Sequence, residues 1–391
     1  MKILVYQWRA YNVEDICQTL IAMGHVVDCV NYDLTNIEED DIFKKQLTDC
    51  LVQGNYAMML SVNYFPIIAY GCYEVGVPYI SWTCDSPLLA LYTRSAFLPT
   101  NHLFSFDKSV YYEFLAKGIK NNYYLPLCVD IERLSALPFT EKEQAHYEGD
   151  IAFVGSLYEK NSYDDMTNLP DYLRGYFDAA MLAQMEIYGE NFLERMITDE
   201  IEDELEKHAI RIEGDEYLGG VAMIMANTHL GMKLAAMERH KILNMLSKKH
   251  QVNFYTASDT SALPRVRNRG KVDYMTQMPQ VFRASKINLN ITLRNIKTGI
   301  PLRIWDIMGA GGFVLTNYQP ELELYFENGK HLVWFESHAD LQKKADYYLE
   351  HDEERREIAG NGHELVCKEH SYRVRLKQMF AMLEKNGVSF S

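Results

Sequence analysis

The sequence lacks the features that mark secreted, membrane-spanning and zinc-binding proteins. Its seven cysteines are scattered, odd in number and without a C-x-x-C pair, which argues against a disulfide framework and a zinc site. No apolar run reaches the roughly 18 residues of a membrane-spanning helix, so we expect no stable membrane insertion. The first residues, "MKILVYQW", lack the basic, apolar and small-residue series of a signal peptide. We therefore expect a cytoplasmic protein.

Positive charge is also scarce. The formal net charge is -15, from 39 Lys and Arg against 54 Asp and Glu. Nucleic-acid binding needs a basic surface, so no nucleic acid is expected as a partner. Eleven acidic and three basic residues lie between Glu190 and Glu216, a segment that is either a contact for a basic partner or a solvated helix face. No D-x-D follows a strand-like run, and we expect no metal site.

What the sequence does have is a repeated alternation of short apolar runs and helical stretches. Its 391 residues suffice for two to three domains of about 150 residues each, and 48% of them are apolar. Strand-like runs occur at 3–5, 26–30, 58–62, 78–82, 102–105 and 123–125, and again at 151–154, 252–255, 271–273, 287–291, 313–315 and 332–334. The stretch "VEDICQTLIAMGH" fits an amphipathic helix. This order predicts parallel sheets flanked by helices.

Two α/β domains are expected, each Rossmann-like and doubly wound, facing each other across a cleft. The polar stretch "PFTEKEQAHYEGD" marks the boundary. We assign residues 1–147 to one domain, which the family resemblance described below makes the acceptor side, and 148–370 to a second domain with a helical insertion at about 160–248. Residues 371–391 are expected to form a helix that either rests on an anionic membrane surface or, as the same resemblance implies, packs across the two domains. Ligands of open α/β sheets bind beyond the carboxyl ends of the strands, so residues at these ends are the candidates for a site.

The stretch "KTGIPLRIWDIMGAGGFVLTN" follows such a strand, which ends near Asn290. It predicts a helix capped by Thr298 or Gly299, with Pro301 in its first turn. A helix N-terminus favours anions, and three cations lie beside it: Arg294, Lys297 and Arg303. Together they fit a phosphate site.

Asp306 lies three residues after Arg303, on the same face of the predicted helix. A carboxylate beside a phosphate site is suited to accept hydrogen bonds from ribose hydroxyls. The alternative is a surface ion pair between Arg303 and Asp306. In "DIAFVGSLY", the turn at Gly155 and Ser156 is either a second diphosphate contact or a tight turn without a ligand.

The first half of the chain offers a candidate base. Asp85 in "YISWTCDSP" follows a strand-like run and could deprotonate an acceptor hydroxyl, provided that its pKa is raised. The alternative is an Asx turn before Pro87. Asn63 lies at a similar strand end and could hold acceptor or sugar hydroxyls. Trp8 and Arg9 could contact an acceptor, although packing explains Trp8 equally well.

The segment "GIPLRIWDIMGAGGFVLTNYQPELELYFENGK" resembles the donor-binding segment of two-domain glycosyltransferases of the GT-B fold. It is most similar to the CgeB-like family of the spore maturation type. Other stretches, in order along both halves, agree: "SVNYFPIIAYGCYEVGVPYISWTCDSPLL", "FSFDKSVYYEFLAKGIKNNYYLPLCVD", "DIAFVGSLY", "SKINLNIT", "YYLEHDEERREIAGNGHELV" and "EHSYRVRL". The resemblance implies a nucleoside diphosphate-sugar donor, UDP-linked in our interpretation, and a protein or surface-glycan acceptor.

The resemblance also assigns roles residue by residue. In the wider group an "E-x7-E" motif cradles the donor. Its second acidic position, on the ribose, is Asp306 here, and its first is replaced by Thr298. Because the replaced carboxylate lies against the sugar in retaining relatives, the anomeric outcome does not transfer. Cations would neutralise the departing diphosphate, so no metal and no further cofactor are expected. Two alternatives remain: an inactive sugar-nucleotide-binding scaffold for surface or spore layer assembly, and a sugar-nucleotide epimerase of the same fold.

Overall fold

The computed structural model describes residues 1–208 and 218–388, which divide into two compact units. Unit 1 comprises Met1–Asp130, residue 218 and residues 369–388. Unit 2 comprises the described residues from Ile131 to Lys368 apart from residue 218. Each unit contains its own parallel sheet.

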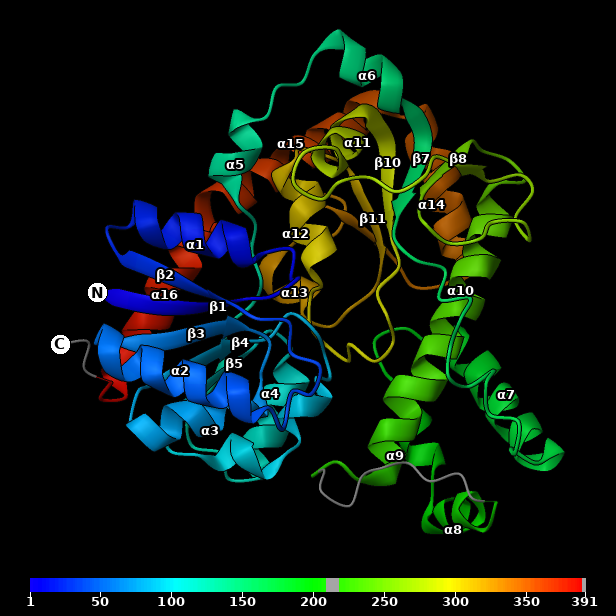
Figure 1. The fold of residues 1–391 in the computed structure, drawn as a ribbon. Coiled ribbons are helices and arrows are strands. Elements are labelled where there is room, and N and C mark those ends of the chain that lie inside the picture. Colours follow the sequence, from blue (N-terminus) through cyan, green and yellow to red (C-terminus); the bar gives the residue numbers. More distant parts are fainter. Residues whose placement is uncertain (209–217, 389–391) are drawn as a thin grey trace. The chain divides into compact units, whose positions relative to one another are not determined.

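Unit 1 is built on a six-stranded sheet in the order β2-β1-β3-β4-β5-β6. The strands are β1 (Lys2–Gln7), β2 (Val26–Asn31), β3 (Met58–Val62), β4 (Tyr79–Trp82), β5 (Asn101–Ser105) and β6 (Asn122–Tyr124). The helices are α1 (Val13–Ala22), α2 (Asp41–Gly54), α3 (Pro66–Val75), α4 (Lys108–Ala116) and α16 (Tyr372–Lys385), with short 3-10 turns η1 (Leu89–Leu91) and η2 (Arg94–Phe97). In Figure 1 the strands of unit 1 lie between α1 on one face and α2 and α3 on the other.

The inner strands of the unit 1 sheet are buried on both faces, because helices cover each side, whereas the edge strand β2 is partly exposed. Every residue of β3, β4 and β5 is buried, and these strands read as continuous runs such as "MMLSV" rather than as alternating patterns. The six predicted strands of the first half and the helix at "VEDICQTLIAMGH" are confirmed.

Unit 2 contains a second six-stranded parallel sheet, in the order β12-β11-β10-β7-β8-β9. The strands are β7 (Gly149–Val154), β8 (Val252–Tyr255), β9 (Arg267–Asn268), β10 (Ser285–Asn290), β11 (Val314–Asn317) and β12 (Val333–Phe335). The predicted strand at 271–273 is wrong, since the pairing residues are Arg267 and Asn268. Asp273 instead accepts hydrogen bonds from the backbone N–H and the hydroxyl of Thr276, which forms a turn.

The helices of unit 2 are α5 (Ile131–Ala136), α6 (Glu141–Tyr147), α7 (Asp171–Met185), η3 (Leu193–Met196), α8 (Asp199–Lys207), α9 (Gly220–Ile224), α10 (Gly231–Leu246), α11 (Met278–Ala284), α12 (Leu302–Gly309), α13 (Leu322–Tyr325), α14 (His338–Glu350) and α15 (Asp352–Glu369). One π-helical turn, η4 (Met225–Leu230), joins α9 to α10.

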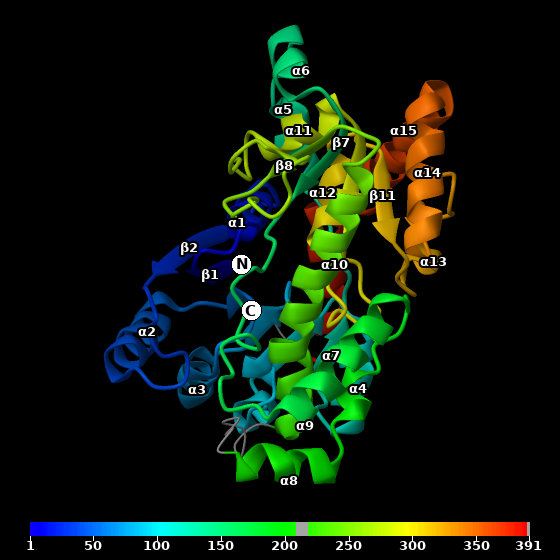
Figure 2. The same ribbon diagram turned by 90° about the vertical axis from the view of Figure 1, so that its right-hand side faces the viewer.

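The expected helical insertion lies between β7 and β8 and consists of α7 to α10. In Figure 2, α10 extends from the sheet of unit 2 towards α7, α8 and α9. The insertion has a hydrophobic core of its own, with Leu173, Phe177 and Leu234 among its buried residues. Part of the acidic segment identified in the sequence, residues 209–216, lies outside the described residues.

The division between the units falls at Asp130, not at the predicted boundary near residue 147. The predicted linker forms α6, which begins with a capping box at Thr140 and Glu143 and packs on α11. Arg283 of α11 also donates to the backbone carbonyls of Leu134 and Leu137. These contacts bind 131–147 to unit 2. The last helix, α16, belongs to unit 1, where it contacts α1.

Candidate functional site

Three of the predicted donor contacts lie at the carboxyl ends of neighbouring strands in unit 2. Gly155 and Ser156 follow β7, and Asn290 ends the adjacent strand β10. The Ser156 hydroxyl accepts a hydrogen bond from the Tyr158 backbone N–H at 3.0 Å, as expected of a tight turn. Asn290 donates to the hydroxyls of Thr292 and Thr316, each at 2.9 Å. The structure thus brings these residues to one edge of the sheet.

Arg239 of α10, which the sequence did not single out, ties these two strand ends together. Its guanidinium donates to the carbonyl of Ser156 at 2.7 Å and to that of Ile291 at 3.0 Å. The guanidinium also lies over the Tyr158 ring, 4.7 Å from its centre. Burial lowers the pKa of Arg239, although the neighbouring Tyr158 and Glu238 act in the opposite direction. Arg239 therefore fixes the turn after β7 relative to β10.

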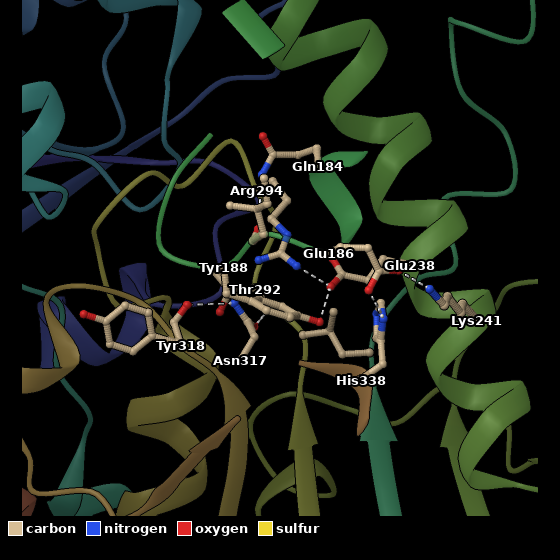
Figure 3. Close-up of polar contacts among 12 residues, drawn as sticks. Gln184, Glu186, Tyr188, Glu238, Lys241, Thr292, Arg294, Asn317, Tyr318 and His338 are labelled. Atoms are coloured by element: carbon tan, nitrogen blue, oxygen red, sulfur yellow. Dashed lines mark hydrogen bonds and ion pairs between the residues drawn. The ribbon is translucent and has the colours of Figure 1, made fainter. Parts of the chain in front are cut away.

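Arg294 follows β10 and is buried in an ion pair (Figure 3). Its Nη2 lies 2.7 Å from Glu238 Oε1, and the two side chains are only 3% and 1% exposed. The guanidinium lies over the Tyr188 ring at 3.7 Å, and the Tyr188 hydroxyl donates to the same Glu238 oxygen at 3.0 Å. Burial raises the pKa of Tyr188, and the charge of Glu238 raises it further. One of the three predicted phosphate cations thus already has a carboxylate partner.

A second set of charges surrounds this pair, as Figure 3 also shows. Glu186 accepts a hydrogen bond from Lys241, and its other oxygen lies 3.4 Å from Nδ1 of His338. The bond from Lys241 lowers the pKa of Glu186. Burial and the nearby Lys241 lower the pKa of His338. The charge of Lys241 is balanced by Glu186.

The loop that precedes α12 is held by residues after β11. Lys297 pairs with Glu194 at 2.9 Å. The Thr298 hydroxyl donates to Glu321 at 2.7 Å, and the Gln319 amide contacts the Gly299 carbonyl at 3.4 Å. The prediction that Thr298 or Gly299 caps the helix is wrong: α12 begins at Leu302, and its N-cap is Pro301 in an extended conformation. Gln319 and Glu321 thus fix the loop before α12 through these hydrogen bonds.

Arg303 and Asp306 both lie on α12 but in different surroundings. Asp306 is 5% exposed, and the Tyr274 hydroxyl donates to its Oδ1 at 3.0 Å. Arg303 is half-buried, contacts the sulfur of Met278 and lies over the Phe282 ring at 5.6 Å. The alternative of a surface pair is wrong, because Asp306 is buried. No carboxylate in residues 1–208 and 218–388 pairs with Arg303.

In unit 1 the structure joins two residues that the sequence suggested separately. The amide of Asn63, after β3, donates to Oδ2 of Asp85 at 2.6 Å. The amide oxygen of Asn63 accepts from the Cys84 backbone N–H at 2.9 Å. Asn63 is 3% exposed and adopts a left-handed conformation (φ 62°), which turns the chain at the end of β3. Asp85 is exposed, with its carboxylate oriented by a buried amide rather than by an Asx turn.

The two remaining acceptor-side candidates differ in how firmly they are held. The Trp8 indole donates to the Val62 carbonyl at 2.8 Å and packs edge-on against Phe65. Trp8 therefore lies beside the end of β3, next to Asn63. The nearest ionic contact of Arg9 is Asp33 at 3.8 Å, and both side chains are about 90% exposed, so this contact contributes little.

No three His, Cys, Asp or Glu side chains among the described residues are grouped so that they could hold a metal ion. In that same part of the chain, no helix is both long enough and apolar enough to cross a membrane.

The comparison with known proteins identifies the fold. A sucrose-phosphate synthase from Thermosynechococcus elongatus superposes with a TM-score of 0.57 at 9% identity, over 99% of this chain and 100% of that one. Anabaena HepE in complex with UDP and glucose gives a TM-score of 0.52 at 12% identity, over 98% and 100%. The chain has the GT-B fold. The predicted fold class is thus confirmed.

A match to a family model extends this result. Residues 238–381 of this GT-B chain match the family described as glycosyl transferase-like. The matched segment begins at Glu238 and includes β10, the loop with Arg294 and Lys297, and α12. A glycosyltransferase from Rickettsia africae has a TM-score of 0.54 at 9% identity, with 98% of each chain covered. Among curated protein sequences, none matches this chain.

Proposed function

We propose that this protein is a glycosyltransferase of the CgeB-like type, which moves a sugar from a UDP-sugar to a protein or surface-glycan acceptor. The match of residues 238–381 to the glycosyl transferase-like family carries the proposal, because that segment contains all the predicted donor residues except Gly155 and Ser156. Structures of the same fold include Anabaena HepE with UDP-glucose and a T4 phage protein with its UDP-glucose substrate. These neighbours support UDP as the nucleotide. We assign the reaction to the cytoplasm.

The donor would bind at the carboxyl edge of the unit 2 sheet. We assign the diphosphate to Arg303 and the start of α12, since Arg303 lacks a carboxylate partner in the described chain. The charges of Arg294 and Lys297 are balanced by Glu238 and Glu194. In this proposal the two cations do not contact the diphosphate directly but contribute to the positive potential around it. The turn at Gly155 and Ser156 would donate the backbone N–H of Ser156, since that of Gly155 already donates to the Tyr255 carbonyl at 3.2 Å. Asp306 would accept from the ribose.

The transfer step needs a base for the acceptor hydroxyl, and we propose Asp85. The acceptor oxygen attacks the anomeric carbon, its proton passes to the Asp85 carboxylate, and the bond between the sugar and UDP breaks with UDP taking the electron pair. Asn63 orients Asp85 through the hydrogen bond of 2.6 Å. The negative charge that grows on UDP is stabilised by Arg303 and the N–H groups of α12, so we propose transfer without a metal or a further cofactor.

Calorimetric titration with UDP, GDP and dTDP tests the donor assignment. We expect UDP to bind, and Asp306→Ala to weaken it by about 10- to 100-fold, the loss for hydrogen bonds to a charged group. Tyr274→Phe is the matched control, because it removes the hydroxyl beside Asp306 and keeps the carboxylate. If the alanine variant does not fold, Asp306→Asn takes its place, because asparagine retains the shape of the side chain. Binding that is equal in wild type and Asp306→Asn would refute the assignment of Asp306.

Release of UDP from UDP-glucose separates the enzyme from the inactive scaffold. A scaffold would bind UDP-glucose without turnover. Mass analysis of the sugar product distinguishes transfer from epimerisation, since an epimerase returns an isomeric UDP-sugar of unchanged mass.

A further inference from the structure

Two buried hydroxyl groups hold the segment of unit 1 that carries Asn63. The Ser61 hydroxyl of β3 donates to the backbone carbonyl of Asn63 at 2.6 Å. The Tyr79 hydroxyl of β4 lies 2.6 Å from Ser61 Oγ and accepts a hydrogen bond from the Phe65 backbone N–H at 3.1 Å. Ser61 and Tyr79 are both fully buried. The chain after β3 is therefore held by two side chains, one from each of two neighbouring strands.

The hydroxyl protons of this network have a single arrangement. A hydroxyl group has one proton to donate. Because Ser61 gives its proton to the Asn63 carbonyl, which can only accept, Tyr79 must be the donor in the contact between the two hydroxyls. Burial raises the pKa of Tyr79 well above its usual range, so the phenol keeps this proton. Tyr79 therefore donates to Ser61, and Ser61 donates to Asn63.

Asn63 connects this network to Asp85. Its backbone is left-handed (φ 62°), and the bond from Ser61 holds its carbonyl in that conformation. Its side-chain oxygen accepts from the backbone N–H groups of Cys84 and Asp85, at 2.9 and 3.4 Å, so the amide cannot turn over without losing both bonds. The amide nitrogen is thereby directed at Asp85 Oδ2, 2.6 Å away. A chain of contacts thus runs from Tyr79 through Ser61 and Asn63 to the carboxylate.

We propose that Tyr79 is a positioning residue for the transfer reaction, which keeps the Asp85 carboxylate in its reactive orientation through Ser61 and Asn63. This inference rests on the proposed function, in which Asp85 is the base. Proton transfer needs the base within hydrogen-bond reach of the acceptor hydroxyl, so a carboxylate that rotates freely is less often in the reactive geometry. Asp85 is exposed, and its orientation therefore depends on the bond from Asn63 rather than on packing.

Tyr79→Phe removes the hydroxyl and keeps the ring. We expect kcat for release of UDP from UDP-glucose to fall about 10- to 100-fold, the effect of a displaced catalytic group. KM should stay at the wild-type value, because the predicted donor residues lie in unit 2. Tyr64→Phe is the matched control: Tyr64 is buried in the same segment, but its hydroxyl donates to Ser95. This variant should lose a similar amount of thermal stability and retain the wild-type kcat.

A double-mutant cycle separates positioning from a general loss of stability. Once Asp85→Asn has removed the base, adding Tyr79→Phe should lower kcat no further. An equal fall in both backgrounds, or a wild-type kcat in Tyr79→Phe, would overturn the proposal. A wild-type kcat in Asp85→Asn would instead refute the base assignment of the proposed function. Ser61→Ala breaks the same chain of contacts and takes the place of Tyr79→Phe if that variant does not fold.

NMR of the Asn63 side-chain amide tests the network without turnover. In wild type its two N–H protons should have well-separated chemical shifts, because one of them bonds a carboxylate at 2.6 Å. Tyr79→Phe should bring the two shifts together, whereas Tyr64→Phe should leave them unchanged. Unchanged shifts in Tyr79→Phe would contradict the positioning role. A protein that released no UDP would refute the proposed function, and the amide shifts would still report on Tyr79.

Discussion

The orientation of Arg294, one of the predicted cations of unit 2, is set by a buried carboxylate. Arg294 is held by Glu238 at 2.7 Å, with both side chains almost fully buried. A buried charge without a partner costs several kcal/mol, so each member of the pair depends on the other. This pairing directs the guanidinium of Arg294 towards Glu238 and Tyr188. The role of Arg294 in the protein is therefore testable through stability as well as through nucleotide affinity.

Glu238→Gln should lower the free energy of unfolding by about 3–5 kcal/mol, the usual cost of breaking a buried ion pair. The reason is that Arg294 would remain buried without a counter-ion. Urea denaturation at pH 7 measures the change. Glu190→Gln is the control, because Glu190 pairs with Arg195 on the surface, with both side chains more than half exposed; we expect a loss of at most about 1 kcal/mol there. Equal losses in the two variants would contradict the assignment.

A buried histidine in unit 1 should make stability depend on pH. Burial lowers the pKa of His102 to about 4, compared with about 6.5 for an exposed histidine. Between these values the unfolded chain binds a proton that the folded chain does not. Stability is therefore full above pH 6.5 and falls as the pH is lowered towards 4.

Denaturation of wild type and His102→Gln at pH 7 and pH 5 measures this contribution. We expect wild type to lose about 2 kcal/mol more than His102→Gln over that interval, because the variant lacks the titrating group. His351→Gln, at an exposed histidine of unit 2, should follow wild type. Parallel losses for wild type and His102→Gln would show that His102 keeps an ordinary pKa in the folded protein.

Most strands could be predicted from the sequence because parallel strands buried on both faces appear as continuous apolar runs. The strand β3, "MMLSV", is such a run, with every residue buried. The short strand β9 could not be found this way, because Arg267 and Asn268 are both exposed. The start of α12 was misplaced because Gln319 and Glu321, about 20 positions further on, hold the preceding loop. Local signals do not reveal such distant partners.

Two glycines of α15 should respond in opposite ways to alanine. A Cβ on Gly362 would lie 2.2 Å from the carbonyl oxygen of His331, so Gly362→Ala should destabilise the protein by about 1–3 kcal/mol through overpacking. Gly360 has nothing within 4 Å of the added atom, and Gly360→Ala should stabilise the helix by about 0.5–1 kcal/mol. Urea denaturation of both variants checks the pair. Stabilisation by both would mean that α15 shifts freely against the loop before β12.

For the chain as a whole, the sequence located the strand ends of the candidate site but not the contacts made there. Asn63 and Asp85 were chosen separately, and their hydrogen bond joins residues 22 positions apart. The partners of Arg294 and Lys297 lie 56 and 103 positions away. A sequence shows which charges exist, whereas folding decides which of them meet. That Arg303 contacts Met278 and has no carboxylate partner among the described residues emerges only once these pairs are known.

In the proposed reaction, residues of the chain stabilise the negative charge of the departing UDP. Removal of divalent metal ions should therefore not affect the rate. If Arg303 and α12 carry that charge, release of UDP from UDP-glucose should continue at the wild-type rate after dialysis against EDTA. Arg303→Met should lower kcat by about 100- to 1,000-fold, the effect of removing one stabilising donor. Arg356→Met, at an exposed arginine of α15, is the control and should leave kcat unchanged. Activity that EDTA abolishes and Mg²⁺ or Mn²⁺ restores would contradict this mechanism, because a divalent cation would then supply the charge assigned to Arg303.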